Sequence, residues 1–118
     1  YKVLVFAGTT EGYEICRFLA DHKIETKGFV ATEYGSKSLA ESEFLTVQTG
    51  RLDAAAMEET FLQEKPEMVL DATHPYAAEV TVNIRTACEN TQTAYYRVLR
   101  EAGEHEQIIW IRHREVYC

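Results

Sequence analysis

Short apolar strands alternate with helical segments along this 118-residue chain. Strands are predicted at residues 2–7, 26–32, 45–49, 67–71, 94–99 and 108–111, and helices at residues 10–22, 54–64 and 76–90. Strands that alternate with helices of this length form βαβ units, whose right-handed crossovers make the strands parallel. We therefore predict a Rossmann-like α/β fold, an open parallel sheet of five or six strands in the order 3-2-1-4-5 with helices on both faces.

Charge and composition exclude several classes of protein. The net charge of −7 argues against nucleic acid or an anionic membrane surface as the main partner. No apolar run approaches the roughly 20 residues that cross a bilayer. Cys16, Cys88 and Cys118 lie far apart without a CxxC pair, so we expect reduced thiols in the cytoplasm and no metal site. Residues 1–118 fit one domain by the usual size of domains, and we expect them to be part of a longer protein.

A loop with two glycines follows the first predicted strand and opens the first helix. Backbone N–H groups and the helix dipole would face an anion there, and two threonine hydroxyls would add donors for a phosphate. The loop consists of Gly8, Thr9, Thr10, Glu11 and Gly12. It is not a complete G-x-G-x-x-G, and it lacks the G-K-[ST] of a nucleotide triphosphatase. A tight turn with a threonine N-cap is the alternative without a ligand.

An acidic residue ends the second predicted strand, about 20 residues beyond the glycine loop, where the Rossmann pattern places one. Glu33, next to Thr32, would bind the adenosine ribose hydroxyls of NAD there and would repel a 2′-phosphate. Lys37 lies nearby and would attract such a phosphate. The sequence therefore favours NADH slightly over NADPH, with a solvated turn as the alternative for Glu33.

Residues 71–77 (Asp-Ala-Thr-His-Pro-Tyr-Ala) place polar groups directly after a buried-looking strand. In a parallel sheet that edge is where ligands bind, and Pro75 suits the first turn of the helix that follows. His74 is a candidate to bind an anionic group or to transfer a proton near neutral pH. The alternative is structural: Thr73 and His74 cap the helix, and Asp71 satisfies loop amides.

Three arginines lie near the ends of predicted strands. Arg51 follows Gly50 after the third strand, while Arg97 and Arg100 flank the end of the fifth. Cations at this edge would suit a ligand rich in carboxylates, although surface arginines and a loop glycine explain the same residues.

Together these motifs resemble the precorrin-6A reductase family of corrin biosynthesis. The resemblance rests on residues 8–11, 50–52 and 71–77, on Asn83, Ala87 and Cys88, and on Tyr96, Arg97 and Arg100. Residues 30–35 (Val-Ala-Thr-Glu-Tyr-Gly) resemble the anaerobic branch, whose substrate is cobalt-precorrin-6A. Ala7 replaces a glycine that often precedes the loop in this family.

The resemblance implies reduction of one double bond of cobalt-precorrin-6A or precorrin-6A by NADH or NADPH. The fold would then have two Rossmann-like halves, residues 1–118 forming the N-terminal one, with cofactor and tetrapyrrole in the cleft between them. Residues 8–12 would hold the pyrophosphate, Thr32, Glu33 and Lys37 the adenosine end, and Thr73 the nicotinamide side. His74 would be the candidate proton donor, and Arg51, Pro75, Tyr76, Arg97 and Arg100 would contact the substrate. A Rossmann-type dehydrogenase or epimerase for a smaller substrate, and a non-catalytic nucleotide- or partner-binding module, stay open as alternatives.

Overall fold

The computed structural model describes residues 2–31, 39–74, 78–100 and 108–112, with side chains as far as Val98. Every predicted strand and helix is present, and the bounds that fall on described residues lie within two residues of those expected. The expected strand end at residue 32 and helix start at residue 76 lie outside the described residues. The elements are β1 (Lys2–Ala7), α1 (Thr10–Asp21), β2 (Glu25–Val30), β3 (Leu45–Thr49), α3 (Ala54–Glu64), β4 (Met68–Ala72), α4 (Ala78–Thr91), β5 (Tyr95–Arg100) and β6 (Ile108–Arg112).

The sheet has the strand order β3-β2-β1-β4-β5-β6. The first five strands are parallel, which confirms the predicted Rossmann-like order. The sixth departs from the expected parallel sheet, because β6 pairs antiparallel with β5, Tyr96 opposite Arg112. Only residues 101–107 join the two strands, and a parallel partner needs a crossover of about a dozen residues or more.

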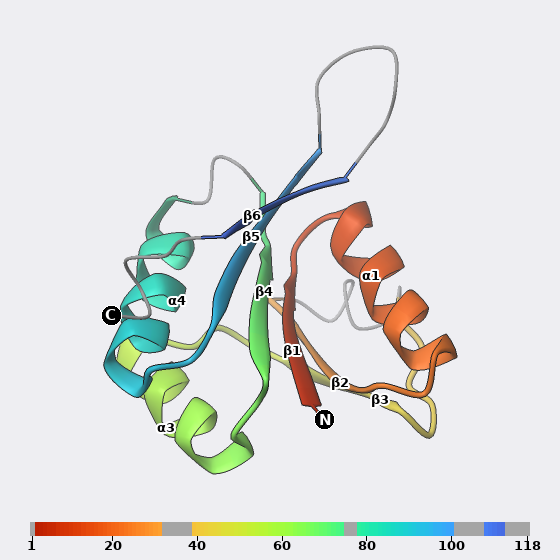
Figure 1. Ribbon diagram of the computed structural model, residues 1–118, viewed down its shortest axis with the longest axis horizontal. Coiled ribbons are helices and arrows are strands. Elements are labelled where there is room, and N and C mark those ends of the chain that lie inside the picture. Colours follow the sequence, from red (N-terminus) through yellow and green to blue (C-terminus); the bar gives the residue numbers. More distant parts are fainter. Residues whose placement is uncertain (1, 32–38, 75–77, 101–107, 113–118) are drawn as a thin grey trace.

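Each face of the sheet is covered by helix, as Figure 1 shows. Alternate β1 side chains point to opposite faces. Val3 and Val5 pack in one apolar cluster with Ile15 of α1. Leu4 and Phe6 lie in the other, which also contains Met57 and Phe61 of α3 and Ile84 of α4. The central strands are therefore buried on both sides, and their functional groups must lie at the strand ends.

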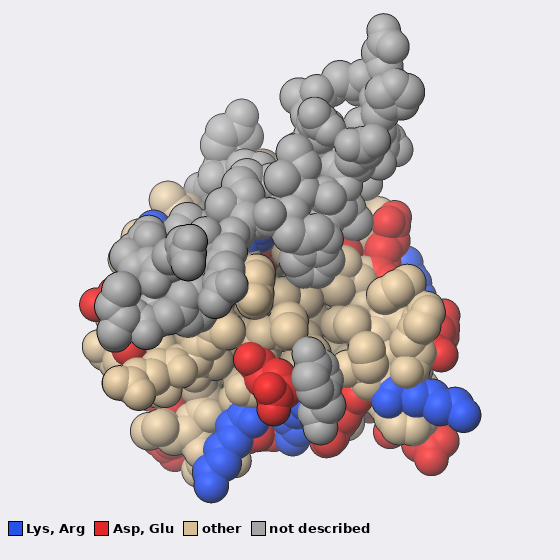
Figure 2. All heavy atoms as spheres, in the orientation of Figure 1, with Lys and Arg blue, Asp and Glu red and all other residues tan. Residues whose placement is uncertain are grey.

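Local sequence signals position the helices. Asp53 caps α3, its Oδ1 accepting a hydrogen bond from the Ala56 N–H at 2.8 Å. Lys65 ends α3 in the left-handed conformation, with φ 49°. Within the described ranges, no helix is long and apolar enough to traverse a bilayer. On the face shown in Figure 2, acidic and basic side chains lie interspersed near the lower rim.

Candidate functional site

The carboxyl ends of β1 and β4 lie side by side at the centre of the sheet. β1 pairs with β2 on one side and with β4 on the other, so the strand order changes direction between β1 and β4. The Gly8 N–H donates to the Ala72 carbonyl at 3.3 Å, which joins the two loops that follow these strands. In open α/β sheets, ligands bind in the crevice at this point of reversal. The two motifs singled out in the sequence therefore meet at the expected edge.

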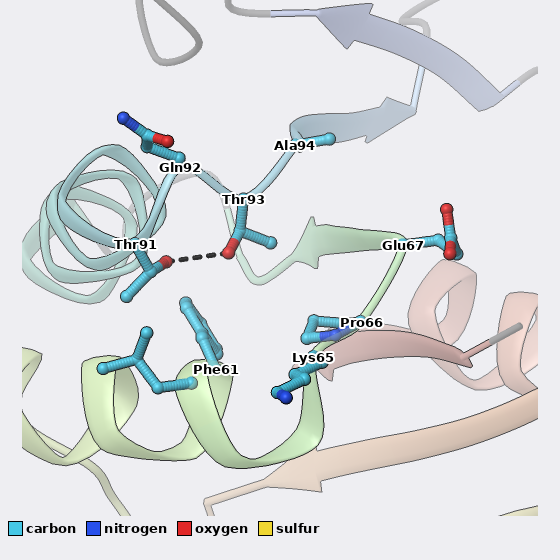
Figure 3. Close-up of a pocket in the computed structure, with 9 residues that line it drawn as sticks. Phe61, Lys65, Pro66, Glu67, Thr91, Gln92, Thr93 and Ala94 are labelled. Carbon is cyan, nitrogen blue, oxygen red and sulfur yellow. Dashed lines mark hydrogen bonds between the residues drawn. The ribbon is translucent and has the colours of Figure 1, made fainter.

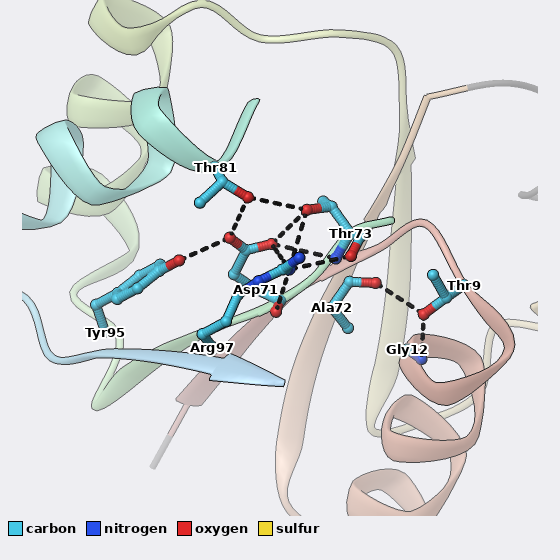
Figure 4. A network of polar contacts seen from close by, with 8 residues as sticks. All are labelled: Thr9, Gly12, Asp71, Ala72, Thr73, Thr81, Tyr95 and Arg97. Atoms are coloured by element: carbon cyan, nitrogen blue, oxygen red, sulfur yellow. Dashed lines mark hydrogen bonds and ion pairs between the residues drawn. The ribbon is translucent and has the colours of Figure 1, made fainter. Parts of the chain in front are cut away.

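Thr9 ties the start of α1 to the end of β4. Its hydroxyl donates to the Ala72 carbonyl at 2.8 Å and accepts from the Gly12 N–H at 3.3 Å, as Figure 4 shows. The structure therefore contains the threonine N-cap that was the structural alternative for this residue. Because the Thr9 hydroxyl hydrogen is already donated within the protein, its predicted role as a phosphate donor would require that bond to break.

Gly12 allows α1 to pack directly on the sheet. A Cβ built at Gly12 would lie 2.7 Å from the Ala7 Cα, 2.9 Å from the Ala7 Cβ and 3.2 Å from the Ala72 Cβ. Only glycine fits this approach, the role of the last glycine in a dinucleotide-binding turn. The close approach fixes the N-terminus of α1 at the carboxyl ends of β1 and β4.

The first turn of α1 is a mixed electrostatic environment. N–H groups at the start of a helix have no acceptor within the helix, and the dipole places partial positive charge there. Thr10 is exposed, so its hydroxyl lies within reach of an external ligand. Glu11, in the same turn, is half-buried and would oppose a second negative charge. An anion at this turn would therefore rely on backbone N–H groups and Thr10.

A fully buried carboxylate, Asp71, organises the end of β4. Its Oδ1 accepts from the Thr73 N–H at 3.1 Å, the Thr73 hydroxyl at 2.6 Å and an Arg97 Nη1 at 3.0 Å. Its Oδ2 accepts from the Thr81 hydroxyl at 2.9 Å and the Tyr95 hydroxyl at 2.7 Å. Burial and the adjacent Asp71 carboxylate raise the pKa of Tyr95, so the phenol remains a donor. Five donors thus surround one carboxylate (Figure 4).

Arg97 and Thr73 are largely committed to this network. Arg97 Nη1 also donates to the Asp71 carbonyl at 3.1 Å and the Thr73 carbonyl at 3.0 Å, and the arginine side chain is 10% exposed. The prediction that Arg97 is a substrate-binding cation did not anticipate this pairing. Thr73 gives both its N–H and its hydroxyl hydrogen to Asp71, and its carbonyl and hydroxyl oxygens accept from Arg97 Nη1 at 3.0 Å and 3.3 Å. A cofactor contact at Thr73 would therefore have to share or displace these partners.

His74 is exposed at the site, directly after Thr73. A Cβ built at Gly8 would lie 3.4 Å from the Thr73 Cα and 3.7 Å from the His74 nitrogen, so the β1 and β4 loops are in contact here. Those are ordinary contact distances. Gly8 and His74 therefore border the same part of the edge.

The loop after β3 has a backbone that requires glycine. Gly50 has φ +120°, with nothing within 4 Å of a Cβ built there, and its N–H donates to the Val30 carbonyl at 2.9 Å. A left-handed φ of this kind favours glycine. Arg51, next along the chain, is exposed.

Comparison with known proteins decides the family. A family model described as "Precorrin-6x reductase CbiJ/CobK" matches residues 2–117. The chain belongs to this family. The cobalt-precorrin-6A reductase of Methanothermobacter thermautotrophicus is 34% identical over 100 residues, 84% of this chain and 33% of the relative. That of Salmonella typhimurium is 33% identical over 115 residues, 98% of this chain and 42% of the relative.

A solved structure of the family has the same fold. A protein described as CobK precorrin-6A reductase superimposes with a TM-score of 0.73 and 28% sequence identity, covering 89% of this chain and 41% of that one. The chain thus spans between a third and a half of the length of the relatives it matches. The resemblance read from the sequence motifs is confirmed at the level of the family.

Several predicted site residues of this CbiJ/CobK chain lie outside the described part of the structure. They are Thr32, Glu33, Lys37, Pro75 and Tyr76, together with the side chain of Arg100, whose backbone belongs to β5. Within the described residues, no group of three or more histidine, cysteine, aspartate or glutamate side chains is placed to hold a metal ion.

Sequence reasoning missed Thr81 and Tyr95 as partners of Asp71. The structure makes Asp71 and Arg97 register partners on the neighbouring parallel strands β4 and β5, so their opposite charges face each other. No comparable pattern identified Thr81, which is ten residues from Asp71 on a helix. Its contact depends on how α4 packs against β4.

A surface hollow of about 410 Å³ lies at the opposite edge of the sheet (Figure 3). It is lined by Phe61, Leu62, Lys65, Pro66, Glu67, Thr91, Gln92, Thr93 and Ala94. These residues lie at the ends of α3 and α4 and before β4 and β5, so the hollow is at the amino ends of the strands. We assign the functional site to the carboxyl edge, where the sheet topology and the family motifs coincide.

Proposed function

We propose that this chain forms the nicotinamide-nucleotide half of a reductase for cobalt-precorrin-6A or precorrin-6A. The observation that carries the proposal is the contact between the Gly8 loop and the Thr73–His74 segment at the point where strand order reverses. Membership of the CbiJ/CobK family supports a reductase that acts on a precorrin. The remaining part of the cleft would come from a second domain.

The residues present fit a dinucleotide at the start of α1. The space a Cβ would need at Gly12 is filled by Ala7 and Ala72, which holds the helix N-terminus at the edge. The pyrophosphate would bind the first N–H groups of α1 and the Thr10 hydroxyl. When bound, the reduced nicotinamide supplies the hydride. The protein positions the ring beside Thr73 and His74 and limits access of water to it.

The adenosine end and its preference for NADH extend the same proposal. Glu33 and Thr32 would bind the ribose hydroxyls, and Lys37 would determine how well a 2′-phosphate is tolerated. A carboxylate in this position accepts from ribose hydroxyls and repels a phosphate. NADH would then bind somewhat more tightly than NADPH.

The macrocycle would bind against the exposed side of the edge. Its peripheral carboxylates would pair with Arg51 and Arg100, and with Arg97, whose side chain is 10% exposed. Pro75 and Tyr76 would contribute to the wall of this subsite. His74, which is exposed directly after Thr73, would supply the proton that must follow the hydride.

Calorimetric titration of the chain with NADH and with NADPH tests the cofactor proposal. We expect saturable binding, with NADH preferred, and about a fivefold loss of affinity in Thr10→Val, because one hydrogen bond to phosphate is removed. Thr86→Val, an exposed threonine on α4, is the matched control and should bind as the parent does. A folded chain that binds neither dinucleotide would refute the proposal for this half.

His74→Ala, made in a reductase that carries both halves, tests the proton-donor role. We expect kcat to fall at least about tenfold with little change in KM for the dinucleotide, since general acid–base groups contribute on that order or more. Unchanged kinetics would remove His74 from the mechanism. Turnover of a smaller carbonyl substrate in place of the macrocycle would favour the dehydrogenase alternative.

A further inference from the structure

We infer that Asp71 is a positioning residue for the nucleotide edge, acting through the Thr73–His74 segment and Arg97 without touching a ligand itself. The inference rests on the proposed function for its ligand, and on the contacts of a single buried carboxylate for its mechanism. It gives Asp71 a role other than acid–base chemistry, for which His74 is the candidate in this motif.

The first step is that Asp71 has no acceptor capacity left for a substrate. A carboxylate offers about four lone-pair sites, and this one accepts five hydrogen bonds within the protein. It is also completely buried. A ligand group could reach it only by displacing a donor from an enclosed network.

The second step is that the network fixes the backbone after β4. The Thr73 N–H is held by Asp71 Oδ1, and the Thr73 carbonyl accepts from Arg97 Nη1. Both polar groups of the Thr73 backbone are therefore held, one by Asp71 and the other by Arg97. The orientation of Thr73 determines the position of His74. Thr73 also lies against the β1 loop, since a Cβ added at Gly8 would be 3.4 Å from the Thr73 Cα.

The third step is that three elements are joined at this one group. Thr81 comes from α4, Tyr95 and Arg97 come from β5, and Asp71 and Thr73 belong to β4 and its loop. Thr9 adds α1 through the Ala72 carbonyl, one residue away from Asp71. Loss of one donor to Asp71 should therefore displace the edge locally, while the apolar clusters on the two faces of the sheet are retained.

The test uses two threonines of the same helix. Thr81→Val removes a hydroxyl that donates to Asp71 and lies 3.3 Å from the Thr73 hydroxyl, whereas Thr91→Val removes a hydroxyl that bonds Ala87 and Thr93 at the opposite edge. Hydrogen exchange at the Thr73 amide is measured in each variant, together with the affinity for NADH. Tyr95→Phe removes the second Oδ2 donor and replaces Thr81→Val if that variant does not fold.

We expect Thr81→Val to speed exchange of the Thr73 amide about tenfold and to weaken NADH binding about fivefold, since hydrogen bonds to charged groups are among the stronger ones. Thr81→Ser, which restores the hydroxyl, should recover both values. Thr91→Val should alter neither. Recovery in Thr81→Ser would show that the hydroxyl itself is needed. Thr91→Val controls for a general loss of stability, because it removes a threonine hydroxyl from the same helix.

Equal Thr73 exchange in Thr81→Val and Thr91→Val would overturn the inference, as would unchanged NADH affinity in Thr81→Val. A parent chain that binds no dinucleotide would refute the proposed function. The exchange measurement would still decide whether Asp71 positions Thr73, because that measurement needs no ligand.

Discussion

Gly12→Ala is the substitution whose effect the structure determines most directly. The added methyl carbon would lie 2.7 Å from the Ala7 Cα and 2.9 Å from the Ala7 Cβ, with a third contact of 3.2 Å to the Ala72 Cβ. All three carbons belong to buried central strands, β1 and β4, and cannot rotate away. The helix must move outwards, which also stretches the hydrogen bond between the Gly12 N–H and Thr9.

The size of the effect follows from two opposing terms. Overpacking of this kind costs about 3 kcal/mol, towards the upper end of the usual range, because the clash involves backbone and β-carbons. Alanine gains about 1 kcal/mol over glycine inside a helix. We therefore expect the free energy of unfolding to fall by about 2 kcal/mol.

Urea denaturation of Gly12→Ala, with Gly8→Ala as the matched control, measures this difference. At Gly8 the nearest atom to an added Cβ is at 3.4 Å, an ordinary contact, so its stability should change by less than about 1 kcal/mol. If Gly12→Ala were as stable as the parent, α1 would not pack on β1 as described. The dinucleotide site at its N-terminus would then lose its structural basis.

Two further predictions concern titratable groups. The hydrogen bond from Lys2 holds the pKa of Glu64 below its ordinary value of 4.5. This carboxylate therefore stabilises the fold above its unfolded pKa and loses that contribution as pH falls through the folded pKa. Urea denaturation between about pH 3 and pH 7 should show that the free energy of unfolding falls less steeply with acid in Glu64→Gln than in the parent, and an identical slope would contradict the pairing. Burial raises the pKa of Cys16 to about 12. Alkylation at pH 8, detected by mass spectrometry, should therefore label Cys16 in urea and spare it in the folded chain. Rapid labelling of Cys16 in the folded chain would contradict its burial in the core.

The fold could be predicted closely because its signals are local and repeated. Asp53 before a helical run, Pro66 after it, and the alternation of strands with helices each indicated an element that the structure contains. The direction of β6 was harder to predict from local signals, because its apolar run suits either orientation. Only the short connection to β5 favours the antiparallel one.

The position of the candidate site could be predicted from the sequence, but the hydrogen bonds within it could not. Residues 8–12 and 71–77 were placed at the same edge because parallel strands end there together. The roles of Thr9 and Arg97 depended on which hydrogen-bond partner lies nearest in three dimensions. Thr9 reaches Ala72, 63 positions away, and Arg97 reaches Asp71, 26 positions away; both contacts arise only once β1, β4 and β5 are assembled.

Mapping of backbone amide chemical shifts during titration with NADH tests the central claim most directly, because it locates the ligand. We predict that the shifts concentrate at Gly8, Thr10, Thr73 and His74, at the carboxyl ends of β1 and β4. Shifts confined to Phe61, Thr91 and Thr93 around the opposite hollow, or none in a folded sample, would contradict the assignment of the site.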